Sequence, residues 1–491
     1  MPTTGLKEIT SQERSAYRPT SLDDCLDKIR GYFESYAPKR LSYRRKGYHG
    51  LLERYYKFYV PAGSRVLEIG CGTGDLLAAL QPSEGVGIDL SPEMIRIARE
   101  NYPSQNLKFE AEAIERWTVS ERPFDYIILS DLVGFLYDIR EVFKVLKPLC
   151  HERTRIVCNY HSQAWKPVLG ILEALHLKFR QPVLNWVTRE DIQNLFEVSG
   201  FDVISQDSRM LFPARFPLVS GFLNRICAPF WPFRAFNLTN WTVARLPKAL
   251  PDDMGVSVVC PVRNEAGNIP NIVRRLPKFS SPYELIFVEG NSKDATLEAC
   301  HQAVKDNPQL EISVFKQPGK GKGDAVRVGY AQAKYDILVI LDGDMTVQPE
   351  DLPKFVEVLR SGTAEFVNGS RLVYPMEGQA MRFLNLLGNK FFSAAFSFLI
   401  GQKVKDTLCG TKVLIKSDWL RLVANRSFFG DFDPFGDFDL LFGSARLSLK
   451  IRDFPIRYRD RTYGETNISR FRHGFLLLKM CGVALRKLKM R

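Results

Sequence analysis

The sequence predicts an α/β protein with two domains, each built on its own sheet of mainly parallel strands. Apolar strand patterns alternate with helical patterns in two separate series, and such alternation is typical of parallel sheets. One strand of each series ends in a polar turn, at residues 66–74 and at residues 339–344. The length of 491 residues also exceeds the roughly 250 to 300 residues at which a single hydrophobic core stops growing.

The first series follows a stretch rich in tyrosine and arginine, residues 21–59, which reads as helices, and a turn at 61–63. The strands are expected at 65–69, 85–89, 107–111, 124–129 and 154–159, and the helices at 75–80, 93–101 and 139–146. In a parallel sheet a ligand binds beyond the carboxyl ends of the strands. The glycine-rich turn after the first strand occupies that position.

Gly70, Gly72 and Gly74 stand where the backbone must turn with positive φ or approach a ligand closely. Asp89 ends the second strand, where a carboxylate can accept hydrogen bonds from both ribose hydroxyls of a nucleotide. Nicotinamide enzymes carry G-x-G-x-x-G, whereas the third glycine here comes one residue earlier and is followed by Asp75. The turn therefore predicts a nucleotide-type ligand other than a nicotinamide dinucleotide.

With Glu68 before it, this turn resembles the E-x-G-x-G-x-G signature of the class I S-adenosylmethionine-dependent methyltransferases. The resemblance extends through residues 89–94 and 124–128 and covers about residues 45–205, and the family's two further strands fit 201–205 and 240–245. It implies that the three glycines lie against the methionine moiety of S-adenosylmethionine and that Asp89 holds its ribose. Glu112 and Ala113, after the third strand, are expected to approach the adenine.

The sequence leaves the methyl acceptor open, because transfer from a sulfonium needs alignment and exclusion of water more than it needs acid–base residues. Asp131, Tyr137 and His161 follow the fourth and fifth strands and are candidate bases. Each of them can equally be a structural residue.

A connection between domains is expected near residue 250, where two prolines, charges and a glycine separate apolar runs. The second series then begins, with strands expected at 256–260, 283–288, 311–315 and 337–341 and helices at 268–276, 294–306 and 323–334. Its fourth strand stops at Asp342 and Asp344, which flank a glycine. Two carboxylates in this arrangement can share one Mg²⁺ or Mn²⁺, which takes further ligands from substrate phosphates. A polar turn without metal is the alternative.

Three ordered motifs, at 259–265, 288–296 and 321–325, resemble the family 2 glycosyltransferases with the GT-A fold over about residues 254–375. Further motifs at 369–371, 406–412 and 454–465 are similar to the dolichyl- or polyprenyl-phosphate mannose and glucose synthases. The resemblance implies a nucleotide-diphosphate sugar as donor, with Asp342 and Asp344 holding the metal on its diphosphate. The donor-binding residues that it implies are Pro261, Glu265, Glu289, Asp294, Lys322 and Asp342.

On the acceptor side, the resemblance places Arg371 and Arg382 near the acceptor phosphate and lets Arg461 close over the donor diphosphate. Surface ion pairs are the alternative for each arginine. A sugar hydroxyl as acceptor would need a carboxylate base, for which Asp437 in the acidic run 430–439 is the candidate, unless this run only caps a helix. Many relatives carry Asp-Asp where this chain has Glu289 and a glycine, so the sugar donor stays open.

The net charge of +13 fits nucleic acid, an anionic membrane or phosphorylated substrates. Nucleic acid is not expected, because no aromatic RNA-binding repeat is present. The tail after Glu465 has no acidic residue and alternates cations with apolar residues, which favours an interfacial helix on an anionic membrane surface over a helix docked on its own domain. Residues 212–234, aromatic and basic, are a second candidate for membrane contact or a buried cover loop.

No apolar stretch reaches the roughly 18 to 20 residues that a membrane span needs, and no secretory signal is evident near the start. Nine cysteines without a C-x-x-C pair indicate neither a disulfide framework nor a zinc site. We therefore expect a cytoplasmic protein, peripheral on the cytoplasmic face of the membrane.

The predicted organisation is a methyltransferase domain at 1–247, a linker at 248–254, a glycosyltransferase domain at 255–465 and a basic tail at 466–491. The resulting hypothesis is a bifunctional transferase. One domain would move a sugar, with inversion and a divalent metal, to a polyprenyl phosphate or to a glycan or glycolipid. The other would methylate an acceptor of the same glycan pathway. The alternative is that only the glycosyltransferase is active and the methyltransferase-like domain is a binding or scaffold module.

Overall fold

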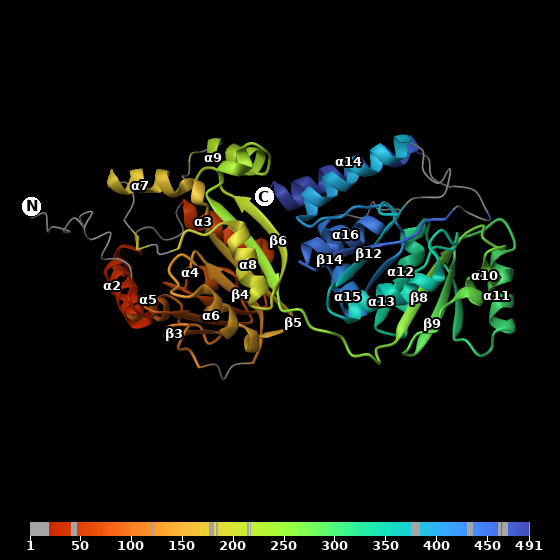
Figure 1. The fold of residues 1–491 in the computed structure, drawn as a ribbon, viewed down its shortest axis with the longest axis horizontal. Helices are drawn as coiled ribbons and strands as arrows, with labels where there is room; N and C mark the ends of the chain where they lie inside the picture. Colours follow the sequence, from red (N-terminus) through yellow and green to blue (C-terminus); the bar gives the residue numbers. More distant parts are fainter. Residues whose placement is uncertain are drawn as a thin grey trace, which may run out of the picture. The chain divides into compact units, whose positions relative to one another are not determined.

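The computed structural model describes residues 19–40, 47–118, 122–175, 181, 182, 185–213, 216, 218–374, 383–429, 436–459, 463 and 470–490. The chain divides into two compact units, Met1–Leu246 and Pro247–Arg491, and each contains one seven-stranded sheet with helices packed on it (Figure 1).

The sheet of the first unit has the strand order β3-β2-β1-β4-β5-β7-β6. Its first five strands run parallel, whereas β7 is antiparallel to both β5 and β6. The strands are β1 (Arg65–Ile69), β2 (Glu84–Asp89), β3 (Leu107–Ala111), β4 (Phe124–Ser130), β5 (Cys150–His161), β6 (Asp202–Arg209) and β7 (Thr239–Arg245). The mainly parallel sheet predicted for this unit is confirmed, and its one reversed strand, β7, lies between β5 and the edge strand β6.

Helices connect most of the parallel strands of this unit, as crossover connections require, although the described residues between β3 and β4 contain none. The longer ones are α2 (Leu22–Arg40), α3 (Tyr48–Tyr59), α5 (Pro92–Asn101), α6 (Ile139–Val145), α7 (Lys166–Ala174) and α8 (Arg189–Val198). The short ones are α4 (Asp75–Ala79), η2 (Lys147–Leu149), η3 (Gln163–Trp165), α9 (Val219–Phe222), η4 (Leu223–Cys227) and η5 (Phe233–Phe236).

Helix α3 is held by one tryptophan of the sheet. The Trp241 ring of β7 lies 5.7, 4.8 and 5.8 Å, centroid to centroid, from the rings of Tyr55, Tyr56 and Tyr59. Trp241, Tyr55 and Tyr56 are buried. Such aromatic pairs add roughly 0.5–1.5 kcal/mol each beyond burial of their area. This packing fixes α3, whose first residue, Tyr48, lies near the carboxyl ends of β4 and β5.

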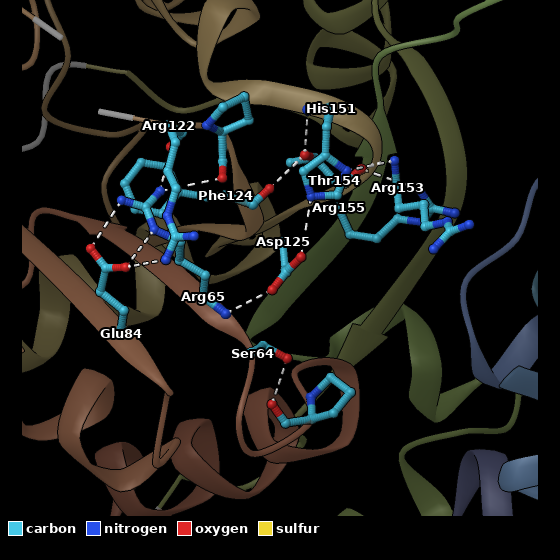
Figure 2. Close-up of polar contacts among 12 residues, drawn as sticks. Ser64, Arg65, Glu84, Arg122, Phe124, Asp125, His151, Arg153, Thr154 and Arg155 are labelled. Carbon is cyan, nitrogen blue, oxygen red and sulfur yellow. Dashed lines mark hydrogen bonds and ion pairs between the residues drawn. The ribbon is translucent and has the colours of Figure 1, made fainter. Parts of the chain in front are cut away.

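A polar cluster fastens the amino ends of β1, β2, β4 and β5, on the edge away from the glycine turn (Figure 2). Arg65 pairs with Glu84 at 2.9 Å, and its guanidinium lies 4.0 Å from the centre of the Phe124 ring. The Arg65 N–H also donates to Asp125 at 2.8 Å, and Asp125 lies 3.1 Å from His151 Nε2. Side chains from four strands thereby set the sheet's register at one edge and leave the other edge to the loops.

The sheet of the second unit has the order β10-β9-β8-β11-β13-β12-β14, with β13 antiparallel to β11 and β12. Its strands are β8 (Val256–Val262), β9 (Tyr283–Glu289), β10 (Ile312–Lys316), β11 (Ile337–Ile340), β12 (Phe366–Ser370), β13 (Lys412–Ile415) and β14 (Ile451–Pro455). Here too the first four strands are parallel, and one later strand reverses.

Helices cover this sheet as well. They are α10 (Ile269–Arg275), α11 (Thr296–Asp306), α12 (Lys322–Gln332), η6 (Pro349–Asp351), α13 (Leu352–Arg360), α14 (Phe383–Ile400), α15 (Lys416–Ala424), η7 (Arg426–Phe428), α16 (Asp437–Arg446), α17 (Arg470–Ala484) and η8 (Leu485–Lys489). Among the described residues, no helix combines the length and the apolar character needed to cross a bilayer.

The basic tail forms α17 and η8 and docks on its own unit. Leu477, Met480 and Leu488 are buried, the two elements contact α14, and Lys489 Nζ lies 5.3 Å from the centre of the Phe398 ring of α14. Phe475 and Leu478 remain exposed. One face of the tail thus packs on its own unit, as in the alternative to an interfacial helix. The other face is exposed and is available for a membrane.

Candidate functional site

The glycine turn of the first unit has two structural glycines and one that faces open space. All three have positive φ, of 74°, 52° and 75° in chain order. A Cβ on Gly70 would lie 2.9 Å from Leu132 Cδ1, and a Cβ on Gly74 would lie 2.8 Å from the Phe109 ring, whereas a Cβ on Gly72 would meet no atom within 4 Å. A ligand can therefore approach the backbone most closely at Gly72, while Gly70 and Gly74 let the turn pack on the sheet.

Asp89 is tied to this turn. Its Oδ2 accepts the Gly72 N–H at 2.8 Å and its Oδ1 accepts the Ser91 N–H at 2.9 Å. Burial raises the pKa of Asp89, and the two backbone N–H groups oppose that rise. Each carboxylate oxygen can accept a further bond. The N–H of Glu112 donates to the Asp89 carbonyl at 3.0 Å, so the predicted adenine-contacting pair, Glu112 and Ala113, lies beside the predicted ribose-binding residue.

Glu68 supplies the second acidic group at this edge. The residue is 2% exposed, and its Oε2 has no hydrogen-bond partner. Burial raises the pKa of Glu68 well above its usual value, opposed by a backbone N–H of Leu77 and reinforced by Asp75 and Asp89. The Glu68 oxygen therefore lies buried without a partner, with Asp75 and Asp89 nearby, at a turn that is open at Gly72. This arrangement fits a cationic sulfonium nucleoside such as S-adenosylmethionine.

A second polar group lies next to the glycine turn. Asp131 follows β4 with φ of 54°, and its neighbour Leu132 is the residue that contacts Gly70. The Tyr48 hydroxyl donates to both Asp131 oxygens at 2.9 and 2.8 Å, and Asn159 Nδ2 donates at 2.6 Å. Burial raises the pKa of Asp131, and His161 acts in the opposite direction. A carboxylate in a left-handed backbone position, held by two donors, is a feature of functional sites.

This group borders a pocket at the carboxyl ends of β4 and β5. The ring of His161 stacks on Tyr48, with 5.8 Å between the ring centres. The pocket is lined by Asp131, Gly134, Phe135, Tyr160, His161, Asn185, Trp186 and Val187. Of the three candidate bases, the structure brings Asp131 and His161 together, whereas Tyr137 is 45% exposed and does not line the pocket. Tyr48 was missed because it precedes Asp131 by 83 residues and lies in no motif.

In the second unit, the turn between the two predicted metal ligands packs on the loop after β8. A Cβ on Gly343 would lie 3.2 Å from the Pro261 carbonyl oxygen and 3.6 Å from Glu265 Cγ. The Glu265 N–H donates to Thr296 at 2.9 Å, and its carboxylate accepts from Asn268 at 2.6 Å. The structure therefore brings Pro261 and Glu265 beside the Asp342–Asp344 turn and holds their loop by hydrogen bonds to its neighbours.

Lys322 forms an ion pair with Asp342, with 2.6 Å between Nζ and Oδ1. Lys322 is the first residue of α12, so the helix N-terminus and its cation face the end of β11. A Cβ on Gly410 would collide with both groups, so only glycine allows the 406–412 turn to lie against them. Burial acts to raise the pKa of Asp342, but Lys322, then Lys412 and Arg371, outweigh it and hold that pKa below its usual value.

Asp344 is buried, and its Oδ1 accepts the Thr346 N–H at 3.1 Å and the Thr346 hydroxyl at 2.8 Å. Thr346 thus orients the second carboxylate. Within the described part of the chain, no group of three or more His, Cys, Asp or Glu side chains is arranged to hold a metal. The pair of aspartates fits a cation such as Mg²⁺, which takes one or two carboxylates and completes its shell with phosphate oxygens and water.

Glu289 and Asp294 accept hydrogen bonds from the loops around this site. Glu289 is buried and accepts a hydrogen bond from the Ser292 N–H. Asp294 accepts from Thr296 and, at 3.4 Å, from the Ala266 N–H. Burial acts to raise the pKa of Asp294, yet these donors lower it overall. Asp294 therefore connects the loop after β9 to the loop after β8, a bracing contact that the motif did not reveal.

Arg371 is paired with a buried carboxylate. Its Nε and Nη2 donate to Asp406 at 2.7 and 2.8 Å, and its own N–H donates to the same carboxylate at 3.0 Å. The Asp406 side chain is fully buried and the Arg371 side chain is 13% exposed. Burial acts to raise the pKa of Asp406, but Arg371 outweighs it and the pKa is lowered. This geometry differs from the predicted contact of Arg371 with an acceptor phosphate, because a carboxylate already takes its bidentate fork.

The structure gives no side-chain position for three other predicted site residues. Arg382 and Arg461 lie outside the described residues. Asp437 begins α16 after Gly436, which has φ of 75°, and its side chain also lies outside the described part. A Cβ on Gly436 would be 2.6 Å from Gly323 Cα, so the start of α16 lies against the start of α12, next to Lys322.

Comparisons with known proteins agree with both resemblances. Residues 41–206 match the family model of a methyltransferase domain, and residues 257–421 match that of glycosyl transferase family 2. The chain is 29% identical over 234 residues to glycosyltransferase AglJ of Haloferax volcanii, covering 46% of this chain and 71% of that protein. The two predicted domain types are confirmed, and the chain is a transferase with a methyltransferase domain and a family 2 glycosyltransferase domain.

Two other relatives are undecaprenyl-phosphate sugar transferases. The mannosyltransferase of Micrococcus luteus is 27% identical over 223 residues, which cover 44% of this chain and 88% of the relative. The 4-deoxy-4-formamido-L-arabinose transferase of Pectobacterium atrosepticum is 32% identical over 117 residues, which cover 23% of this chain. This chain spans about a third of that relative's length, 36%.

Replacing Arg371 by glutamine leaves the Asp406 carboxylate buried without its cation. We expect the free energy of unfolding of the second unit to fall by about 3–5 kcal/mol at pH 7, measured by chemical denaturation. Because the folded-state pKa of Asp406 is lowered, the stability from this pair is present above the unfolded-state pKa, about 3.9, and is lost as the pH falls through the folded-state value. The difference between variant and native protein should therefore shrink in acid.

Lys354→Gln is the matched control within the second unit, because the exposed Lys354 pairs with Asp351. Its cost should stay below about 1 kcal/mol. Equal costs for the two substitutions would show that the buried pair does not stabilise the second unit.

Proposed function

We propose that the chain is a bifunctional transferase of one glycolipid pathway. The second unit would transfer a sugar, with inversion, from a nucleotide-diphosphate sugar to a polyprenyl phosphate, and the first would transfer a methyl group from S-adenosylmethionine to a hydroxyl of a glycan or glycolipid. The observation that carries the proposal is the cluster of Lys322, Asp342 and Asp344 against the loop of Pro261 and Glu265. A cation beside two carboxylates, at the carboxyl edge of a parallel sheet, suits a diphosphate and its metal.

The sugar transfer needs little acid–base chemistry from the protein. A phosphate acceptor is already anionic near neutral pH, whereas a sugar hydroxyl needs a base. We assign Lys322, at the start of α12, to the donor phosphate oxygens, and the lowered pKa of Asp342 keeps that carboxylate ionised at neutral pH. A divalent cation held by Asp342 and Asp344 would stabilise charge on the departing diphosphate.

The proposed acceptor of the sugar is a polyprenyl phosphate. Two relatives carry undecaprenyl phosphate in their names, which favours a polyprenyl phosphate over a free glycan. Because Arg371 is paired with Asp406, we assign it a positioning role. It holds the 406–412 turn, whose Gly410 lies against Lys322 and Asp342. Arg382 and Arg461 stay the candidates for direct contact with acceptor and donor phosphates.

For methyl transfer, the pocket of Asp131 and His161 adjoins the glycine turn through Leu132. An acceptor hydroxyl in that pocket could give its proton to this pair as the methyl group arrives, and Tyr48 and Asn159 would keep the Asp131 carboxylate in place. Fusion of the two units would raise the local concentration of a shared intermediate. A lipid acceptor would require the protein to act at the cytoplasmic face of the membrane, and we propose the exposed side of α17 as one contact.

Substituting Asp89 by alanine removes the acceptor of the Gly72 and Ser91 N–H groups and the proposed ribose ligand. We expect the affinity for S-adenosylmethionine, measured by calorimetry, to fall at least about tenfold, because a hydrogen bond to a charged group contributes roughly 1.5–3 kcal/mol. Glu93→Ala, which disrupts only a surface pair with Arg96, is the control. An unchanged dissociation constant in the Asp89 variant would place the methyl donor elsewhere.

Asp344→Ala removes one of the two proposed metal ligands. Manganese-stimulated hydrolysis of nucleotide sugars should fall at least about a hundredfold, as expected when an electrostatic clamp on the leaving group is lost. Chelation should lower the native enzyme to the same level and leave the variant unaffected. The control is Asp351→Ala, since Asp351 pairs with Lys354 at the surface. Persistent manganese stimulation in the Asp344 variant would disprove the assignment.

Asp131→Asn keeps the shape of the side chain and removes its ability to take a proton. With the products of the sugar transfer as acceptors and labelled S-adenosylmethionine as donor, we expect the rate of methyl transfer to fall about 10²- to 10⁴-fold while the affinity for the methyl donor stays unchanged. In the native enzyme the rate should fall as the pH drops through the raised pKa of Asp131, and this limb should be absent in the variant. Tyr137→Phe should be neutral; a full rate in Asp131→Asn would exclude this carboxylate as the base.

A further inference from the structure

The first unit presents an exposed apolar surface that neither proposed reaction uses. About half of the exposed large apolar side chains in the described part of the chain lie on α7 and the end that follows it, and on residues 216–236. Both α7 and α9 lie beyond the same side of this unit's sheet (Figure 1). We call this surface the aromatic face; its members are Val168, Ile171, Leu175, Phe216, Leu218, Val219, Phe222, Ile226, Phe230, Trp231, Phe233 and Phe236.

The backbone beneath the aromatic face is firmly anchored, so the exposure does not come from an unfolded loop. The buried Asn224 side chain bonds to both the N–H and the C=O of Phe212, at 2.9 and 2.7 Å. Asn237, also buried, donates to the Ala228 carbonyl at 2.9 Å. Trp165 Nε1 donates to the Phe236 carbonyl at 2.7 Å, which joins the segment to η3 and hence to α7. Buried amides hold the chain while Leu218 and Trp231 stand 91% and 86% exposed.

The exposed charge around these residues is mainly positive. Residues 208–251 contain no Asp or Glu, although Arg209 and Arg234 pair with Asp207 and Arg245 pairs with Asp202. Helix α7 carries one acidic residue, Glu173. Arg225 lies exposed between Phe222 and Ile226, and Lys166 lies exposed at the start of α7. Monomeric proteins rarely expose contiguous apolar surface of this kind unless it serves an interaction. Aromatic residues interspersed with cations suit the headgroup region of an anionic bilayer.

We propose that the aromatic face is a monotopic membrane-binding surface that inserts its side chains among the headgroups of an anionic phospholipid bilayer. The inference deepens the membrane location of the proposed function, adds a contact on the methyltransferase unit to the one on α17, and depends on neither transfer reaction. A second copy of the chain is a poorer occupant, because a symmetric contact would bury Arg225 and Lys166 of each copy on a face where Glu173 of α7 is the acidic residue. Anionic lipid instead neutralises them.

The test uses the full chain and vesicles of phosphatidylcholine with about 30 mol% phosphatidylglycerol, compared with phosphatidylcholine alone. Phe222→Ser with Trp231→Ser should weaken co-sedimentation with the anionic vesicles at least about tenfold although the tail is intact. The matched control is Tyr137→Ser with Val198→Ser, which removes two exposed apolar side chains of the same unit outside the aromatic face. It should change binding less than about twofold.

Two further measurements keep the outcomes distinct. Arg225→Glu should weaken binding to anionic vesicles and leave the weak binding to neutral ones unchanged. Tryptophan fluorescence should be quenched by brominated lipid in the native chain, and Trp231→Phe should lose much of that quenching while still binding. Unchanged vesicle binding of the Phe222/Trp231 variant would overturn the proposal. So would a shift of that variant from dimer to monomer without lipid, since it would show that another copy covers the aromatic face.

Discussion

The arrangement of each unit follows from one constraint, a central strand with parallel neighbours on both sides. Val66 to Ile69 of β1 pair in parallel with β2 and β4, and Val256 to Val259 of β8 pair in parallel with β9 and β11. Strands that run the same way end at the same edge, so the turns after β1, β2 and β4 meet there, as do those after β8, β9 and β11. Burial of the strands leaves these turns as the place where polar groups can face a ligand.

Charge at these edges is stabilised by partners that the loops provide. Asp89 takes two backbone N–H groups, Asp342 takes the Lys322 ammonium, and Asp406 takes the fork of Arg371. Leaving a buried carboxylate without its partner would cost several kcal/mol of stability. Each loop is therefore stabilised in the conformation that brings its donor groups to the carboxylate. The glycines follow the same logic. Gly410 lies against Asp342 and Lys322, where any side chain would collide, whereas Gly72 faces the open space in which we propose that the methyl donor binds.

The aromatic face adds a second kind of constraint, since it exposes apolar side chains on a backbone that buried Asn224 and Asn237 hold in place. Burying a large aromatic side chain is worth roughly 1.5–3 kcal/mol, which water does not supply but a headgroup layer does. For an enzyme whose proposed acceptor is a lipid phosphate, attachment to the bilayer brings protein and acceptor into the same layer. Helix α17 of the tail is similar: one side packs on its own unit, and the exposed Phe475 and Leu478 on the other side are available for the proposed membrane contact.

Local patterns alone determined the two-domain α/β organisation, the predicted strands from 65–69 to 337–341, and the turns that carry Gly70–Gly74 and Asp342–Asp344, because periodicity and glycine placement are properties of short segments. Tertiary structure alone decided which distant residues meet: Tyr48 with Asp131, Lys322 with Asp342, and Arg371 with Asp406. It also decided that the tail docks on α14 and that Trp231 stays exposed. These contacts depend on where loops from different strands converge, and spacing along the chain does not encode that distance.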